Sequence, residues 1–240
     1  DLTKECGLSN SKGMWNTIKL IDVEKDGDMD IVAGNLGTNN FFSPNMRIYI
    51  NDFDKNGFYE QIICHKQGNS YFPVLDKDEL INQIPSLKKQ LFYYEEYSNA
   101  SIDQIFNKAL LNESIVLDLN TLESAVYLNS GKVFEKVSLP SEINYSTVFD
   151  IIGYDSSDKN KTKLIFGGNQ YLVKPQFGRH DSSKGWAVDI EKGEDKLNIT
   201  NLKSLNIEGQ IRKFGLINLR KEKILITGIN DQSFKFFNIN

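Results

Sequence analysis

The fold prediction starts from the nine residues Asp22-Val23-Glu24-Lys25-Asp26-Gly27-Asp28-Met29-Asp30. Oxygen-bearing side chains occupy its positions 1, 3, 5, 7 and 9, and a glycine occupies position 6. This spacing lets a tight loop turn its carboxylates inward around one hard cation, because glycine adopts the left-handed conformation that other residues resist. Calcium suits such a loop better than magnesium, since it accepts oxygens in a more tolerant geometry. An acidic loop that is simply exposed to solvent does not require this regular spacing of carboxylates around a central glycine.

A second copy of the pattern is Asp52-Phe53-Asp54-Lys55-Asn56-Gly57-Phe58-Tyr59-Glu60. Its position 7 is Phe58, which offers only a backbone carbonyl, as that position normally does. An EF-hand would need glutamate at position 12, where Ala33 and Ile63 stand, and helices on both sides. Short β-branched and aromatic runs flank both loops instead, which predicts a strand, a calcium loop and a second strand.

Two further strand-turn-strand segments lack the ligands. The first covers residues 146–169, where Asp155 remains but Ser157, Lys159 and Lys163 stand at ligand positions. Two ammonium groups would repel a cation, so we expect no metal there. The second covers residues 211–230 and turns at the basic segment Arg220-Lys221-Glu222-Lys223. Residues 124–128 and 133–137 also alternate, which predicts a hairpin around Asn129-Ser130-Gly131.

Residues 76–113 change to helical spacing of apolar residues. Asp76 or Asp78 can cap a first helix, and Pro85 suits the first turn of a second one. Ser101 with Gln104 predicts a capping box for a third helix. The aromatic cluster Phe92-Tyr93-Tyr94 with Tyr97 is expected to pack in the core rather than to form a ligand platform.

Four copies of one strand-turn-strand unit indicate a repeat architecture, because a lone unit cannot bury both sheet faces. Four-stranded units packed radially give a β-propeller. We therefore predict a mainly β fold, a partial or complete propeller of about four blades at ~45 to 50 residues each. It would form a single domain over residues 1–240, with residues 76–113 as an α-helical insert.

Length, charge and composition restrict the classes of protein and of binding partner that the chain fits. The chain has 240 residues, a net charge of −4 and a pI near 5.4. No basic patch with interleaved aromatics appears, which argues against a nucleic-acid partner. No apolar stretch is long enough to span a membrane. The first residue is Asp1 rather than methionine, so we expect a processed chain or a fragment. Cys6 and Cys64 are expected to be two free thiols.

Catalytic constellations are not evident in the sequence. His65 and His180 are the two histidines, and neither has zinc-like spacing. We expect each to be a surface or hydrogen-bonded residue. No nucleophile elbow, phosphate-binding glycine loop or zinc-protease motif is present. The sequence therefore predicts a protein that is not an enzyme.

Several motifs combine into a family resemblance. They are the Trp15-Asn16 lead-in, the loop at 22–30 and the exit Gly34-Asn35-Leu36-Gly37. Gly178-Arg179-His180-Asp181 follows Gly168-Asn169 in the same manner. Together they resemble FG-GAP/VCBS repeats, the blades of integrin-α-like propellers. The match looks closest to long FG-GAP repeat proteins of Bacteroidetes-type bacteria with ASPIC/UnbV-like regions, in which a helical segment follows a loop like Asn51 to Gly57.

The resemblance implies a calcium-stabilised propeller with two Ca2+ sites. The implied ligands are Asp22, Glu24, Asp26, Asp28 (through its carbonyl) and Asp30, and Asp52, Asp54, Asn56, Phe58 (through its carbonyl) and Glu60. Glu24 and Glu60 depart from the usual aspartate but keep the charge. Asp1-Leu2-Thr3 resembles the tail of a preceding blade, which implies the C-terminal part of a longer propeller.

The function expected from the resemblance is a non-catalytic, calcium-stabilised surface or exported module that recognises protein or glycan. The location would be extracellular, at the outer-membrane surface or in the periplasm, where calcium is abundant. Two alternatives stay open. One is a subunit of a larger surface assembly completed by other blades or by another chain. The other is a calcium-dependent polysaccharide-active enzyme.

Overall fold

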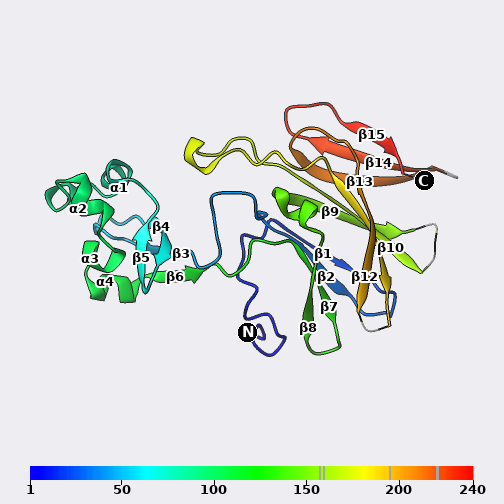
Figure 1. Cartoon of the computed structure of the whole chain (residues 1–240), viewed down its shortest axis with the longest axis horizontal. Helices are drawn as coiled ribbons and strands as arrows, with labels where there is room; N and C mark the ends of the chain where they lie inside the picture. The colour runs from blue at the N-terminus through cyan, green and yellow to red at the C-terminus, as the bar shows by residue number, and fades with distance from the viewer. Residues whose placement is uncertain (157, 159, 195, 220–221, 240) are drawn as a thin grey trace. The chain divides into compact units, whose positions relative to one another are not determined.

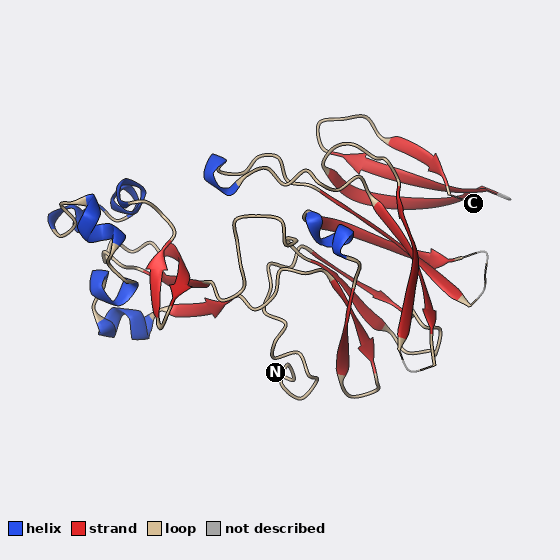
Figure 2. Ribbon diagram, in the orientation of Figure 1, coloured by secondary structure: helices blue, strands red, loops and turns tan. Residues whose placement is uncertain are grey.

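Alternating apolar residues form antiparallel strands over most of the chain, as the sequence predicts (Figures 1 and 2). The computed structural model describes residues 1–156, 158, 160–194, 196–219 and 222–239. These residues form four antiparallel sheets, none of which closes on itself. The mainly β class is therefore confirmed. The chain divides into two compact units, unit 1 with Asp1–Ser43 and Thr121–Asn240, and unit 2 with Pro44–Asn120.

Unit 1 contains three of the sheets, numbered here along the chain. Sheet 1 has the order β1-β2-β7-β8 and consists of β1 (Thr17–Ile21), β2 (Asp30–Gly34), β7 (Ala125–Asn129) and β8 (Phe134–Ser138). Sheet 2 joins β9 (Val148–Asp155), β10 (Lys161–Gly168), β11 (Trp186–Lys192) and β12 (Leu197–Ser204) in sequence order. Sheet 3 joins β13 (Ile211–Leu219), β14 (Glu222–Ile229) and β15 (Lys235–Asn238).

The three hairpins expected after the helical segment are confirmed. β7 pairs with β8, β9 with β10, and β13 with β14, each pair antiparallel. The turn after β9 is shorter than expected, because Tyr154 and Lys163 pair within the ladder instead of lying in a loop. The predicted ligand positions Ser157 and Lys159, and the turn residues Arg220-Lys221, lie outside the described residues.

The sheets of unit 1 pack face to face around two apolar clusters. Val32, Ile151 and Leu164 are buried between sheets 1 and 2, and Ile165 and Phe214 between sheets 2 and 3. β9 lies against β1 and β2, and β13 lies against β9 and β10. Each later sheet therefore places its first strand on the first two strands of the sheet before it.

A buried carboxylate links the three first strands. Asp150 of β9 is 2% exposed, and its Oδ1 lies 3.1 Å from Nζ of Lys19 on β1 and 3.2 Å from Nζ of Lys213 on β13. Its Oδ2 accepts a 2.8 Å hydrogen bond from the Phe214 amide. Opposite charges and hydrogen bonds offset the desolvation of a buried carboxylate, and Asp150 finds such partners on both β1 and β13.

Unit 2 combines a sheet with a helical cover. Sheet 4 has the order β5-β4-β3-β6, with β3 (Arg47–Asn51), β4 (Glu60–Gln67), β5 (Ser70–Pro73) and β6 (Ile115–Asp118). The helical segments are α1 (Lys77–Gln83), η1 (Pro85–Lys89), α2 (Tyr94–Ser98), α3 (Ile102–Ile105) and α4 (Lys108–Glu113). They pack on one sheet face, where Tyr49, Ile62 and Cys64 are buried. Residues 76–113 thus share a compact unit with the second acidic loop.

The predicted helix caps form. Asp76 Oδ1 accepts a 2.8 Å hydrogen bond from the Glu79 amide at the start of α1. Gln104 Oε1 accepts hydrogen bonds from the amide and hydroxyl of Ser101 at 2.8 and 2.9 Å. Local side-chain to backbone bonds of this kind depend on a few neighbouring residues, which explains why the sequence reveals them.

The core prediction for the aromatic cluster is wrong for three of its four residues. Phe92, Tyr93 and Tyr94 are 67%, 68% and 58% exposed, whereas Tyr97 is buried and donates a hydrogen bond to the Leu75 carbonyl. Helix α2 is only five residues long, so of its two aromatic residues, Tyr94 and Tyr97, it presents one to the core, whereas Phe92 and Tyr93 precede the helix.

Both cysteines are free thiols, as predicted. Cys64 lies beneath the helices of unit 2, and burial raises the pKa of its thiol to about 12. Within the described part of the chain, every helix is too short or too polar to cross a bilayer.

Candidate metal centre

The two acidic loops connect paired strands. Residues 22–30 join β1 to β2, where Ile21 pairs with Asp30, and residues 52–60 join β3 to β4, where Asn51 pairs with Glu60. The expected strand-loop-strand arrangement is confirmed for both. Strands on both sides exclude an EF-hand, whose loop lies between helices.

The first aspartate of each loop organises the turn in the same way. Asp22 accepts hydrogen bonds from the amides of Asp26 and Gly27 at 3.1 and 3.0 Å. In the second loop, the corresponding bonds to Asp52 come from the amides of Asn56 and Gly57, both at 2.9 Å. Both oxygens of each first-position carboxylate therefore cap backbone N–H groups that the sharp turn leaves without strand partners.

The carboxylate of the last residue in each loop accepts a hydrogen bond from the backbone amide of the second residue. Asp30 Oδ2 and Glu60 Oε2 accept 2.8 Å hydrogen bonds from the amides of Val23 and Phe53, respectively. Both carboxyl groups are buried. The longer glutamate thus makes the same contact as aspartate, so the departure at Glu60 does not change the framework.

Both loops also repeat one backbone conformation. Position 4 has φ 60° at Lys25 and at Lys55, and position 6 has φ 98° at Gly27 and 92° at Gly57. The glycines at position 6 follow from the sequence pattern, whereas nothing in the sequence indicates left-handed lysines. Such φ values cost L-residues free energy, and here they turn the chain tightly enough to bring the carboxylates together.

Substitution of Gly57 by alanine is expected to lower the free energy of unfolding by about 1 kcal/mol. A Cβ at this position would meet no atom within 4 Å, so backbone strain is the cause rather than a clash. Asparagine tolerates the left-handed region better, so G57N should lose less stability than G57A. Thermal unfolding of both variants measures the difference, and an equal or larger loss for G57N would contradict this account.

Three carboxylates of the second loop converge. One oxygen each from Asp52, Asp54 and Glu60 lies within 4.8 Å of the other two. Among the described residues, one group of at least three Asp, Glu, His or Cys side chains is close enough together to hold an ion, and it is this one. Oxygens on opposite sides of a calcium ion at ~2.4 Å lie about 4.8 Å apart, so the spacing fits calcium. Asn56 Oδ1 accepts from the Phe58 amide at 2.8 Å and faces the same turn.

The first loop has a cation of its own nearby. Lys192 Nζ at the end of β11 lies 3.6 Å from Glu24 Oε1 and 3.8 Å from Asp26 Oδ2. Burial raises the pKa of Glu24, and its contact with Asp26 raises it further. The Asp28 amide lowers the pKa of Asp26 by donating a hydrogen bond to its carboxylate.

Asp30 is the most enclosed carboxylate of the first loop. Burial raises its pKa, and the charges of Asp26 and Asp22 act in the same direction. The amides of Val23 and Asn129 oppose this shift by donating to its two oxygens. The first loop therefore gathers several negative charges that repel one another, which is the electrostatic condition that a bound cation relieves.

Replacement of Lys192 by methionine is expected to tighten calcium binding at the first loop about two- to five-fold, the effect of losing one partly exposed charge. The reason is that the ammonium competes with calcium for Glu24 and Asp26. Isothermal titration on an Asp52→Asn background isolates the first loop. Lys203→Met, which removes an exposed lysine from β12, is the matched control, and equal effects of both variants would refute the competition.

Residues other than the predicted ligands also shape the loops. Asn129 at the end of β7 donates its backbone amide to Asp30 and its side-chain amide to the Met29 carbonyl. Lys192 approaches from sheet 2. Both residues are more than ninety positions away in the chain, and no local pattern could have identified them. The side chain of Asp28 is exposed, and position 7 of the second loop is the exposed Phe58.

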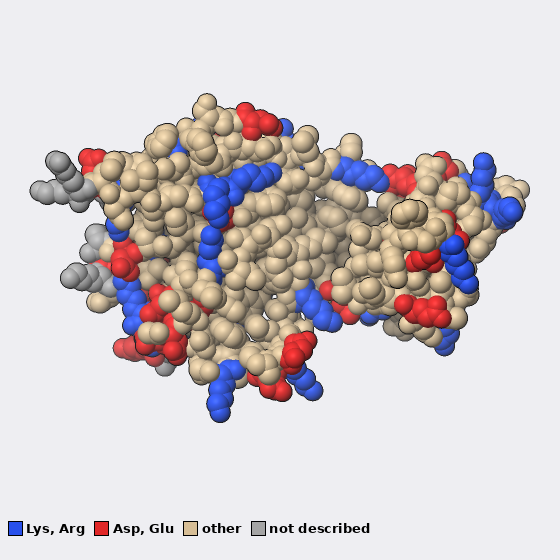
Figure 3. Space-filling view, turned by 180° about the vertical axis from the view of Figure 1, so that it is seen from behind, with Lys and Arg blue, Asp and Glu red and all other residues tan. Residues whose placement is uncertain are grey.

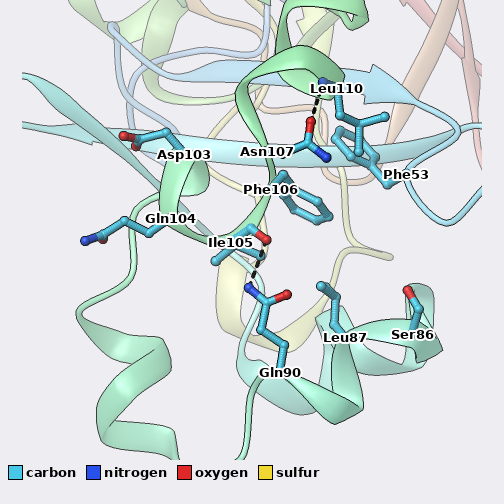
Figure 4. A pocket seen from close by; sticks show the side chains of 10 residues that line it. All are labelled: Phe53, Ser86, Leu87, Gln90, Asp103, Gln104, Ile105, Phe106, Asn107 and Leu110. Carbon is cyan, nitrogen blue, oxygen red and sulfur yellow. Dashed lines mark hydrogen bonds between the residues drawn. The ribbon is translucent and has the colours of Figure 1, made fainter.

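A hollow of about 560 Å³ adjoins the second loop within unit 2 (Figure 4). The ring of Phe53 lines it and packs on Phe106, with 4.5 Å between the ring centroids. Two hydrogen bonds brace its wall, from Gln90 Nε2 to the Ile105 carbonyl and from the Leu110 amide to Asn107 Oδ1. The second residue of the acidic loop is thus anchored in the core of unit 2.

The two histidines have hydrogen-bond partners. His180 is buried, its Nδ1 lies 3.0 Å from Thr147 Oγ1, and burial lowers its pKa. His65 is half-buried, with Nε2 2.7 Å from Gln67 Nε2 and its ring stacked on Phe72. These positions agree with the expectation of hydrogen-bonded residues.

No protein-family model and no curated protein matches the chain. The class that the structure itself defines is a mainly β protein with two acidic hairpin loops of one design. The FG-GAP/VCBS resemblance rests on the motifs quoted above.

Proposed function

We propose that the chain is a calcium-stabilised, non-catalytic interaction module that is exported or attached to the cell surface and binds protein or glycan. One observation carries the proposal. The two loops, thirty residues apart, repeat the same hydrogen bonds, left-handed residues at the same positions, and acidic residues at positions 1, 3 and 9. An acidic turn that binds no ion does not require the same hydrogen bonds, backbone conformation and acidic positions in two separate loops.

Each loop would hold one Ca2+ with oxygen ligands only. In the first loop these are Asp22, Glu24, Asp26, the Asp28 carbonyl and Asp30, and in the second Asp52, Asp54, Asn56, the Phe58 carbonyl and Glu60. When bound, the ion neutralises the clustered carboxylates and ties the two ends of the loop together. Its role here is to rigidify each hairpin rather than to activate a substrate.

The finer fold assignment belongs to the same proposal. Three consecutive sheets in unit 1 adjoin through their first strands, and this succession supports a portion of a β-propeller of the FG-GAP/VCBS kind. Loops of this type suit calcium-rich surroundings, which favours an extracellular, outer-membrane surface or periplasmic location.

Positive and negative side chains are interspersed on the face shown in Figure 3, with wide areas that carry neither. Such a surface favours partners recognised by shape and by hydrogen bonds over a strongly charged polymer such as nucleic acid. A screen of proteins and polysaccharides for retention on the immobilised chain would identify the ligand class. Polysaccharide cleavage during that screen would overturn the non-catalytic assignment.

Direct titration tests the calcium sites. We expect two calcium ions per chain, with magnesium binding much more weakly because it requires a stricter octahedron. Asp22→Asn and Asp52→Asn should each remove one ion. Asp158→Asn, which changes an exposed carboxylate outside both loops, should leave the stoichiometry unchanged. A wild-type chain that binds no calcium at millimolar concentrations would end the proposal.

A further inference from the structure

The imidazole of His180 joins three segments of unit 1. His180 lies in the connection between β10 and β11, where its backbone exchanges hydrogen bonds of 2.7 and 2.9 Å with Gln170. Its Nδ1 lies 3.0 Å from Oγ1 of Thr147, the residue before β9. That hydroxyl in turn donates a 3.1 Å hydrogen bond to the carbonyl of Leu36, which lies just after β2. The buried ring therefore holds the β10–β11 connection against the start of β9 and the end of β2.

These hydrogen bonds fix the tautomer of the ring. A carbonyl oxygen can only accept, so the Thr147 hydroxyl gives its one proton to Leu36 and accepts from His180. Nδ1 therefore carries the hydrogen, and Nε2 is an unprotonated acceptor. Nε2 is buried and has no hydrogen-bond partner among the residues that the structure describes. The opposite tautomer would bury an N–H donor without an acceptor and would take the hydroxyl proton from the carbonyl, which costs more.

The charges around the ring do not compensate a proton on Nε2. Arg179 and Asp181, on either side of it in the chain, pair with each other, with 3.3 Å between Nε and Oδ2. Arg212 of β13 donates to the residue that pairs with His180, and this guanidinium would repel a second cation. The carboxylate of β9, Asp150, is held by two lysines, and residues 35–38 after β2 carry no charge.

We propose that the His180 contact is an acid-sensitive switch, which holds the β10–β11 connection in place at neutral pH and releases it when Nε2 takes up a proton. Protonation would create a buried charge and a new N–H donor with no acceptor, and both are costly away from water. The cost disappears when the ring moves into solvent, so the protonated state favours release. The inference does not depend on the calcium loops.

Release would change the surface of unit 1, because further contacts hold the same connection. The ring of Phe177 packs on Phe41 and Phe42, with 4.9 and 5.2 Å between the ring centroids. Asn39 Nδ2 donates a 3.4 Å hydrogen bond to Ser182 Oγ. The partners Asn39, Phe41 and Phe42 all lie after β2. Movement of the connection separates these rings, so acidic pH uncovers an aromatic surface that is partly covered at neutral pH.

The direction of the pH dependence follows from burial, which lowers the pKa of His180 from its ordinary value of 6.5. The released ring therefore binds a proton more readily than the buried one. The contact contributes its full stability above pH 6.5, and this contribution is lost as the pH falls below that value.

Hydrogen exchange of the full chain, resolved by residue, tests the proposal. Between neutral pH and about pH 5, the amides of Gln170 and His180 should lose protection once the intrinsic pH dependence of exchange is removed. These two amides donate to each other's carbonyls, so their exchange reports the attachment of the connection. The amides within the β10–β11 ladder should keep their protection over the same range.

His180→Asn tests the cause, because its side-chain amide can donate to Thr147 in place of Nδ1–H but takes up no proton. This variant should abolish the acid-dependent loss of protection. His65→Asn makes the same change at the half-buried His65 and should keep the wild-type response.

Nitrogen NMR of the wild-type imidazole adds a test that needs no variant. At neutral pH, Nδ1 should carry the hydrogen and Nε2 should be bare. An Nε2–H tautomer, unchanged exchange of Gln170 and His180 in acid, or the same acid response in His180→Asn would each overturn the proposal.

Discussion

Chelation of calcium is expected to lower the free energy of unfolding by about 2.7 kcal/mol for each site that had been held at a hundredfold excess of calcium over Kd. The linkage is direct, because an ion that binds only the folded loop stabilises that fold. One carboxylate oxygen each of Asp52, Asp54 and Glu60 lies within 4.8 Å of the other two, close enough for all three to bind the same ion. Thermal unfolding with calcium, and with a chelator, measures the difference.

Variants separate the two sites. Asp52→Asn should remove the part of the chelator response that belongs to the second loop, and it also replaces an oxygen that accepts from a backbone amide. Asp103→Asn changes an exposed carboxylate in the same unit and should keep the full response. A melting temperature that chelator does not move, in wild type and in both variants, would show that the loops do not hold calcium.

Removal of the Phe53 ring is expected to cost about 3–5 kcal/mol, the range for deleting a buried phenylalanine from a core. Phe53 is 7% exposed and packs on Phe106. Its amide also closes the second loop by donating to Glu60. Phe53→Ala should therefore both destabilise unit 2 and weaken calcium binding at the second loop, because the ring anchors that amide.

Phe58→Ala is the matched control for this prediction. Phe58 lies in the same loop but is 76% exposed, and the variant keeps the backbone carbonyl. Its unfolding free energy should change by less than about 0.5 kcal/mol, as is usual for exposed positions. Urea denaturation followed by calcium titration checks both variants. Similar losses for Phe53→Ala and Phe58→Ala would contradict the anchoring role of the Phe53 ring.

The exposed aromatic residues at the start of α2 and just before it mark a limit of pattern reading. Large apolar side chains usually enter a core, and on that basis Phe92, Tyr93 and Tyr94 were expected inside. Their exposure depends on how short the helix is and where the chain turns next, which neighbouring residues do not encode. Lys77 Nζ lies 4.5 Å from the centre of the Tyr94 ring, a cation–π contact that no periodicity predicts.

Features that depend on a few consecutive residues could be predicted from the sequence. These are the strands around both acidic loops, the glycine turns at Gly27 and Gly57, and the cap at Asp76. The approach of Lys192 to the first loop, and the shared compact unit of the second loop and the helices, became visible only in the folded chain. The physical reason is the range of the interactions. Turn strain and capping act between neighbouring residues, whereas sheet packing and ion pairing join residues that only the folded chain brings together.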